Sequence, residues 1–107
     1  MTAAEVQAWL RTRKPAPPAV LAERLSQLLA SYPPSRLAAL LSLPEALGAL
    51  GVCTLDSLEG RPPTSREVAL DLLAADAFVT YAFEAAAQLP DTAVEPFAAH
   101  LLAGIRA

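Results

Sequence analysis

The chain has 107 residues and a formal net charge of −3, with 54% hydrophobic and 18% charged residues. Its 24 alanines and 19 leucines far outnumber its six valines and one isoleucine, which excludes an all-β fold because strand-forming residues are scarce. The acidic balance argues against nucleic acid as a partner, so we expect a single all-α domain over residues 1–107.

Prolines separate the apolar segments of the first third of the chain and mark where helices begin and end. The first segment opens with Thr2-Ala3-Ala4-Glu5, a capping-box pattern that predicts a helix reaching about Thr12. A stiff, proline-rich connector over residues 14–18 follows, because each proline restricts the residue before it to extended conformations. A second helix is expected from Pro18 to Tyr32.

Two shorter helices are expected next. One begins at Pro34 or Ser35 and reaches about Ser42. Ser42-Leu43-Pro44-Glu45 is a second capping-box pattern, so another helix begins there and should stop near Gly51, since glycine commonly ends helices. Residues 52–63 are the least regular part of the chain and predict at most one further helical turn.

The second half of the chain is dominated by one long helix. Thr64-Ser65-Arg66-Glu67 is a third capping-box pattern, and nothing interrupts a helix until Leu89-Pro90. We therefore expect a compact irregular or orthogonal bundle of five to seven helices around a long central helix at about 65–89. A last helix should begin near Thr92 and be distorted around Pro96.

A helical wheel places Asp76 in the middle of the widest apolar arc of the helix at 65–89, beside Leu72, Val79 and Phe83. The opposite side carries polar residues together with two large apolar ones: Glu67, Leu70, Asp71, Phe78, Tyr81 and Gln88. The helix is thus apolar almost all round. We expect it to be covered on most sides, either by the other helices or by a second copy of the protein.

Asp76 is the candidate for a special role, because a carboxylate in an apolar arc must find hydrogen-bond donors or a cation, or take up a proton. Thr80, one turn further on, is the local candidate partner. The more distant candidates are Arg36, Arg61, Arg66 and His100. Two interpretations stay open: Asp76 is a structural core residue that anchors a neighbouring helix, or Asp76, Thr80 and Phe83 face a cavity and bind a ligand or serve acid–base chemistry.

Phe78, Tyr81 and Leu70 are turned away from the Asp76 arc, toward the side that would face solvent in a monomer. Apolar side chains gathered there favour a second packing surface. We therefore predict that these three residues form an interface with a second copy or with another protein.

Common catalytic and cofactor patterns are missing from the sequence. The single cysteine, Cys53, excludes an internal disulfide, and together with the single histidine, His100, it is too little for a zinc site. The four glycines do not have the spacing of a phosphate-binding loop. We expect Cys53 to be a buried small hydrophobic residue, and we expect no metal, no cofactor and no enzymatic activity.

The chain contains no apolar run of the length needed to span a bilayer, and its first residues lack the basic start and apolar core of a signal peptide. We therefore expect a cytoplasmic protein with no membrane span. Alanine richness and a preference for arginine over lysine are typical of GC-rich bacterial genomes.

The segment Gly60-Arg61-Pro62-Pro63-Thr64, followed by the helix that runs from Leu73 through Asp76 to Glu84, resembles part of the trans-polyprenyl diphosphate synthases. That family has an Arg-Gly-x-Pro stretch and then a helix reading Gly-Asp-Ala-Leu-Leu, whereas Ala75 precedes Asp76 here. The family's Asp-Asp-x-x-Asp magnesium motifs are missing, since Asp56 and Glu59 are the acids just upstream. The resemblance implies similar packing around a helix, without a site for magnesium-bound diphosphate.

The sequence therefore supports two functional hypotheses. The leading one is a non-enzymatic helical protein that acts by association, as a homodimer or as a subunit with another polypeptide. The alternative is a small helical protein that binds a ligand or carries out catalysis with Asp76 in an apolar cavity.

Overall fold

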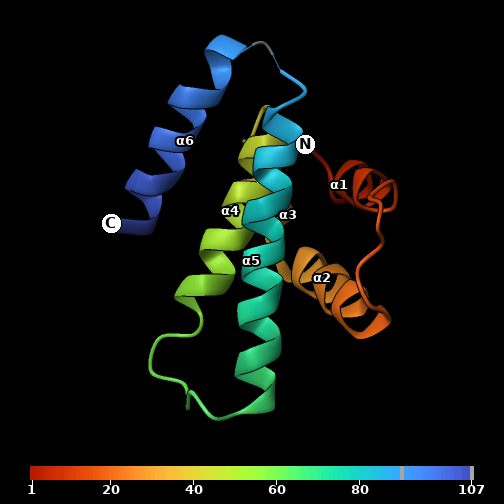
Figure 1. Ribbon diagram of the computed structural model, residues 1–107, viewed down its shortest axis with the longest axis vertical. Helices are drawn as coiled ribbons and strands as arrows, with labels where there is room; N and C mark the ends of the chain where they lie inside the picture. Colours follow the sequence, from red (N-terminus) through yellow and green to blue (C-terminus); the bar gives the residue numbers. More distant parts are fainter. Residues whose placement is uncertain (90, 107) are drawn as a thin grey trace.

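Two antiparallel helices, α4 (Leu43–Asp56) and α5 (Arg66–Ala86), lie side by side along the length of the molecule and form its centre (Figure 1). The computed structural model describes residues 1–89 and 91–106, including all of their side chains except those of residues 91–95 and 104–106. The contact between α4 and α5 is the most extensive of the fold. The prediction of a long central helix is therefore confirmed.

Four further helices surround this central pair. In Figure 1, α1 (Ala3–Leu10) and α2 (Ala19–Ser31) lie on one side of it and α6 (Asp91–Arg106) lies on the other, while α3 (Pro34–Ala38) is a short turn between α2 and α4. The described residues contain these six helices and no strand, so the all-α prediction is confirmed. Pro96 lies inside α6.

The predicted capping residues begin three of the helices, with one shift. The Thr2 side chain accepts a hydrogen bond from the Glu5 amide, and the Glu5 carboxylate accepts one from the Thr2 amide, which is the complete capping box. Ser42 likewise accepts from the Glu45 amide at the start of α4. At α5 the cap is Ser65, one residue later than Thr64, the first residue of the predicted box.

Helix α4 continues through Gly51 to Asp56, so the expected stop near Gly51 is wrong. Gly51 is a contact residue: a Cβ atom built there would lie 2.7 Å from the Val79 Cγ2 atom and 3.3 Å from the Ala75 carbonyl oxygen. The missing side chain lets α4 and α5 approach each other closely. Glycine here serves helix packing and does not end the helix.

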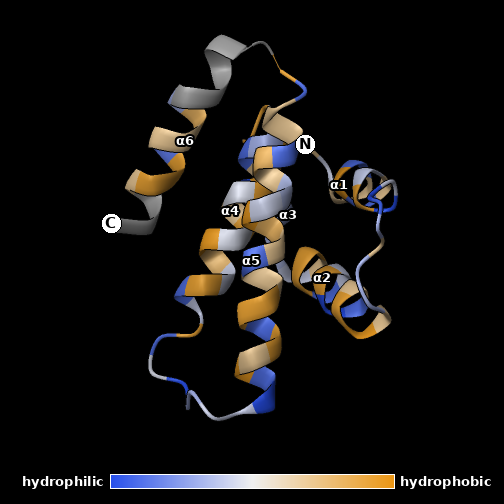
Figure 2. Cartoon of the chain, in the orientation of Figure 1, coloured by the Kyte–Doolittle hydropathy of each residue, from blue (hydrophilic) through white to orange (hydrophobic). Residues whose placement is uncertain are grey.

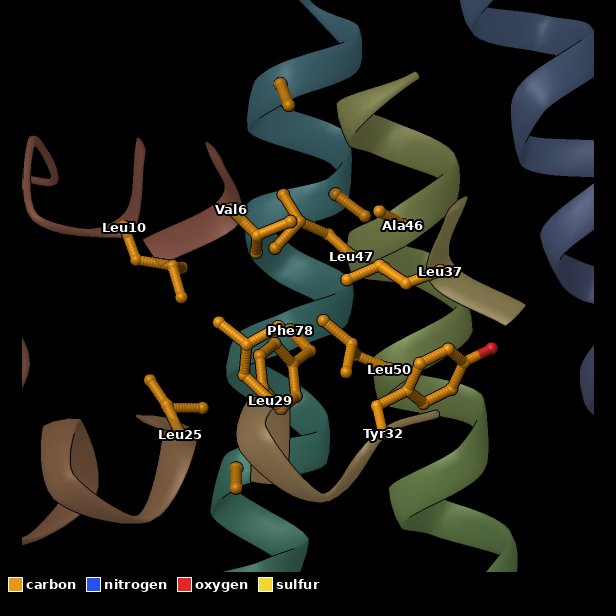
Figure 3. Packing of buried hydrophobic residues seen from close by; sticks show 13 residues of the cluster. Val6, Leu10, Leu25, Leu29, Tyr32, Leu37, Ala46, Leu47, Leu50 and Phe78 are labelled. Atoms are coloured by element: carbon orange, nitrogen blue, oxygen red, sulfur yellow. The ribbon is translucent and has the colours of Figure 1, made fainter. Parts of the chain in front are cut away.

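The hydrophobic core lies where α1, α2 and α3 meet the central pair (Figure 3). Phe78 of α5 is fully buried at its centre, close to Leu29 of α2 and Leu50 of α4 in the close-up. Val6 of α1 and Leu37 of α3 complete the surrounding wall. Every helix before α5 therefore contributes at least one buried anchor, which holds the short elements in place.

Candidate functional site

The side of α5 that faces the core is not the wide apolar arc predicted from the helical wheel. Its buried residues are mostly alanines around one aromatic ring: Val68, Asp71, Ala74, Ala75, Phe78, Ala82, Ala85 and Ala86. Leu72 and Leu73 are 52% and 57% exposed, and Phe83 is also exposed. The predicted orientation of α5 is therefore wrong, because small side chains permit the close approach of α4 that large ones would prevent.

Asp76 lies on the exposed side of α5 as a result. The Asp76 side chain makes no hydrogen bond or ion pair with Thr80 or with any other residue in the described part of the chain, and Thr80 is itself exposed. The interpretation of Asp76 as a buried structural anchor is therefore wrong.

Asp71 takes the anchoring role instead, with a side chain that is 3% exposed. Its Oδ1 atom accepts a hydrogen bond from Arg24 Nε at 2.6 Å, and its Oδ2 atom accepts from Arg24 Nη2 at 3.1 Å and from Arg61 Nη1 at 2.9 Å. Arg24 belongs to α2, and Arg61 to the connector before α5. One carboxylate thus joins two otherwise separate segments to the central helix.

The hydrogen bond from Arg24 is the main reason why the pKa of the Asp71 carboxyl lies below its ordinary value, and Arg61 acts in the same direction. Burial works against this shift, because it disfavours the charged form. Asp71 also raises the pKa of Arg24 through the same hydrogen bond. Sequence reasoning missed Asp71, although its position on the alanine-rich side of α5, one turn before Ala74 and Ala75, was the available signal.

The three residues predicted to form an interface are all engaged within the chain. Phe78 is fully buried in the core, so no second copy can touch it. Half-buried Tyr81 meets the Trp9 ring edge-on, with centroids 6.0 Å apart and planes at 78°. Burial is the main cause that raises the pKa of the Tyr81 hydroxyl. Half-buried Leu70 lines the hollow beside the Asp71 ion pairs.

The contact between α1 and α5 is reinforced by a cation held over an aromatic ring. The Arg13 guanidinium lies 3.7 Å from the centre of the Trp9 ring, and Arg13 Nη1 lies 3.4 Å from Glu84 Oε2. Of the basic cluster that follows α1, this arginine is therefore committed to contacts within the chain.

A groove between α4 and α5, which we call the outer groove, has exposed leucines in its lining. It encloses about 210 Å³ and is lined by Gly51, Val52, Leu55, Leu72, Ala75, Asp76 and Val79. Asp76 is the charged member of this lining. Figure 2 shows the hydrophobic segments of α4 and α5 in this region, beyond the end of α6. Leu55 and Leu72 of this lining are exposed, whereas exposed Leu73 is not part of it.

The ligand-binding set proposed from the sequence is not brought together. Asp76 lines the outer groove, but neither Thr80 nor Phe83 is part of its lining. Phe83 instead meets Phe97 of α6, with ring centroids 5.4 Å apart and planes at 73°. The groove is also smaller than the roughly 300 to 1,000 Å³ typical of small-molecule pockets.

Comparison of the chain with protein-family models, with curated proteins and with solved structures gave no match.

Among the described residues, no group of three or more His, Cys, Asp or Glu side chains could hold a metal ion. In the same part of the chain, no helix is both long enough and apolar enough to cross a membrane. Cys53 is exposed on α4, which corrects the expectation that it is buried.

Proposed function

We propose that this protein acts by binding another polypeptide through the outer groove and its exposed leucines. The observation that carries the proposal is the exposure of Leu55 and Leu72 in the lining of a groove that is itself apolar. Burying apolar surface is favourable by a free energy of about 25 cal/mol per Å², so neighbouring exposed leucines favour binding of a partner that covers them. The chain's own core is complete without them.

A different polypeptide is favoured over a second copy because of where Asp76 lies. Asp76 is the middle residue of α5 (Arg66–Ala86), within the outer groove. A two-fold axis that buries the largest part of this surface would bring two Asp76 carboxylates together. Like charges removed from water repel each other strongly, whereas a partner with its own sequence avoids this cost.

A small-ligand function remains the second candidate, and the observation that favours it is the groove itself, with a carboxylate beside apolar side chains. An apolar amine has the complementary chemistry. The small volume and the absence of Thr80 and Phe83 from the lining argue for the polypeptide instead.

Photo-cross-linking tests the proposed function. A photoreactive phenylalanine analogue at position 72 reports contacts in the groove, and the same analogue at Leu41, which is 90% exposed elsewhere, is the matched control. We expect a cross-linked protein from a cell extract at position 72 and not at position 41. That protein, once purified, should bind the native chain.

The binding measurement then uses variants of the native chain. Leu72→Asp should weaken the affinity at least about tenfold, because it places a charge in the apolar contact, while Leu41→Asp leaves it unchanged. Equal losses in both variants, or an unaltered affinity for Leu72→Asp, would contradict the proposal. Sedimentation of the chain alone tests whether a second copy occupies the groove instead. A dimer that dissociates when Leu72→Asp is introduced would show that the partner is a second copy and not a different polypeptide.

A further inference from the structure

We infer that the segment bound in the outer groove is a basic amphipathic helix, with apolar residues one turn apart on the groove and a lysine or arginine facing Asp76. This inference rests on the proposed function and adds the chemistry of the partner.

The α4–α5 surface already binds one helix through apolar residues, α6 of the same chain. Phe97 meets Phe83, and a Cβ atom added to Gly48 would lie 3.1 Å from the Leu101 Cδ1 atom. Phe97 and Leu101 are four residues apart, so they lie on the same face of α6. The chain's own helix therefore shows how this surface receives apolar anchors from a helix.

The outer groove is continuous with the surface that α6 covers. Val52 lines the outer groove and also the hollow of about 220 Å³ between α4 and α6. In Figure 1, α6 ends about halfway along the central pair, and no other helix of the described residues lies beyond it on that side of α4 and α5. The part of α5 that lines the groove, from Leu72 to Val79, spans about 10 Å at 1.5 Å per residue, which is the length of a helix of about two turns.

The charge of the surface specifies the sign of the partner. Asp76 lies among apolar side chains of the groove lining, and exposed Asp56 is the last residue of α4, directly after Leu55. Arg61, in the connector between α4 and α5, is committed to Asp71. A docked helix removes water from Asp76, which costs free energy unless the helix supplies a cation. Docking of an amphipathic helix into an apolar groove is a common mode of peptide recognition.

Two synthetic helical peptides of equal length test this inference. Both carry leucines at helical spacing on one face, and the flanking positions are lysine in one peptide and glutamate in the other. Fluorescence anisotropy measures their affinity for the native chain and for the variants Asp76→Asn, Asp76→Lys, Leu72→Asp and Leu41→Asp. Thermal melts of each variant check that the fold is retained, which we expect because all three positions, 41, 72 and 76, are exposed.

We expect the lysine peptide to bind the native chain more tightly than the glutamate peptide. Asp76→Asn should reduce the affinity of the lysine peptide by about threefold to tenfold, the range for a partly desolvated ion pair. Asp76→Lys should reverse the preference between the peptides, Leu72→Asp should abolish binding of both, and Leu41→Asp should change neither. Added salt should reduce the difference between the two peptides.

The outcomes separate this inference from the proposed function. Equal binding of the two peptides, or no reversal with Asp76→Lys, overturns the basic partner, while sensitivity to Leu72→Asp would still support association through the groove. Failure of both peptides to bind overturns the helical partner. The cross-linking result at position 72 tests the proposed function independently of either peptide.

Discussion

The two aspartates of α5 lie five positions apart on one helix and have opposite surroundings. Asp71 is buried and accepts hydrogen bonds from two arginines, whereas Asp76 is exposed and has no partner among the described residues. Roughly 140° of helix rotation separates them, enough to move a carboxylate from the interior to the surface. The role of each aspartate is thus determined by which helix packs against its side of α5.

The difference also separates structural from functional surfaces. Asp71 lies on the side that packs on α2 and on the connector before α5, where removal of one partner would leave a buried charge. Asp76 lies on the side where nothing in the described chain covers Leu72 or Leu73. The inner side of α5 therefore holds the fold together, and the outer side is available for association.

Phe78→Ala should have the largest effect on stability, because it removes the fully buried ring at the centre of the core. We expect the free energy of unfolding to fall by about 3 to 5 kcal/mol, from lost burial and the cavity left behind. Phe83→Ala, on the outer side, should cost about 1 kcal/mol through its contact with Phe97. Urea denaturation measures both values, and similar losses in the two variants would contradict the assignment of inner and outer sides.

Asp71→Asn should have the next largest effect. Both oxygens of the Asp71 carboxylate accept hydrogen bonds from arginines, whereas the amide nitrogen of asparagine is a donor and carries no negative charge. The buried ion pairs are therefore broken, and we expect the free energy of unfolding to fall by about 2 to 3 kcal/mol. Asp76→Asn is the matched control and should change the free energy of unfolding by less than about 0.5 kcal/mol, as at other exposed positions. A larger loss for Asp76→Asn than for Asp71→Asn would reverse the comparison.

The sequence predicted the local features of α5 well and its orientation badly. The serine and threonine caps, together with the absence of breakers until Pro90, suffice to predict a long helix, because both signals are local. Which side of α5 faces inward depends on α4. Gly51 lets the two helices approach so closely that alanines fit between them and leucines do not. A hydrophobic wheel weights Leu72 and Leu73 above Ala74 and Ala75, and so it selects the wrong side.

The prediction of the site residues was limited in the same way, because it also depends on which helices pack against α5. An aspartate that anchors a neighbouring helix is one of the two interpretations of Asp76, and the structure places that role at Asp71, because the partner arginine, Arg24, lies on a helix far away in the sequence. The prediction of an interface at Phe78 has the same origin. In the observed orientation of α5, exposed leucines lie on the side of Asp76, where we propose association.

The two arginines should contribute unequally to the anchor at Asp71. Arg24 donates two hydrogen bonds to the carboxylate and Arg61 donates one. We expect Arg24→Gln to lower the free energy of unfolding by about 1 to 2 kcal/mol and Arg61→Gln by about half as much, since both arginines are about one-third exposed and screened by water. Combined with Asp71→Asn, each arginine substitution should lose most of its effect; full additivity would contradict the shared anchor.

The smallest expected effect is the contribution of the Asp71 ion pairs to the pH dependence of stability. The hydrogen bond from Arg24, supported by Arg61, holds the pKa of Asp71 in the folded chain below the unfolded value of about 3.9. A carboxyl with a lowered folded pKa contributes stability that is fully present above the unfolded value and is lost as the pH falls through the folded value. The stability difference between the native chain and Asp71→Asn should therefore be constant from about pH 5 to 7 and shrink below about pH 4. Since the two proteins differ only at residue 71, a stability difference that stays constant down to pH 2 in urea denaturation would show that charge at Asp71 does not stabilise the fold.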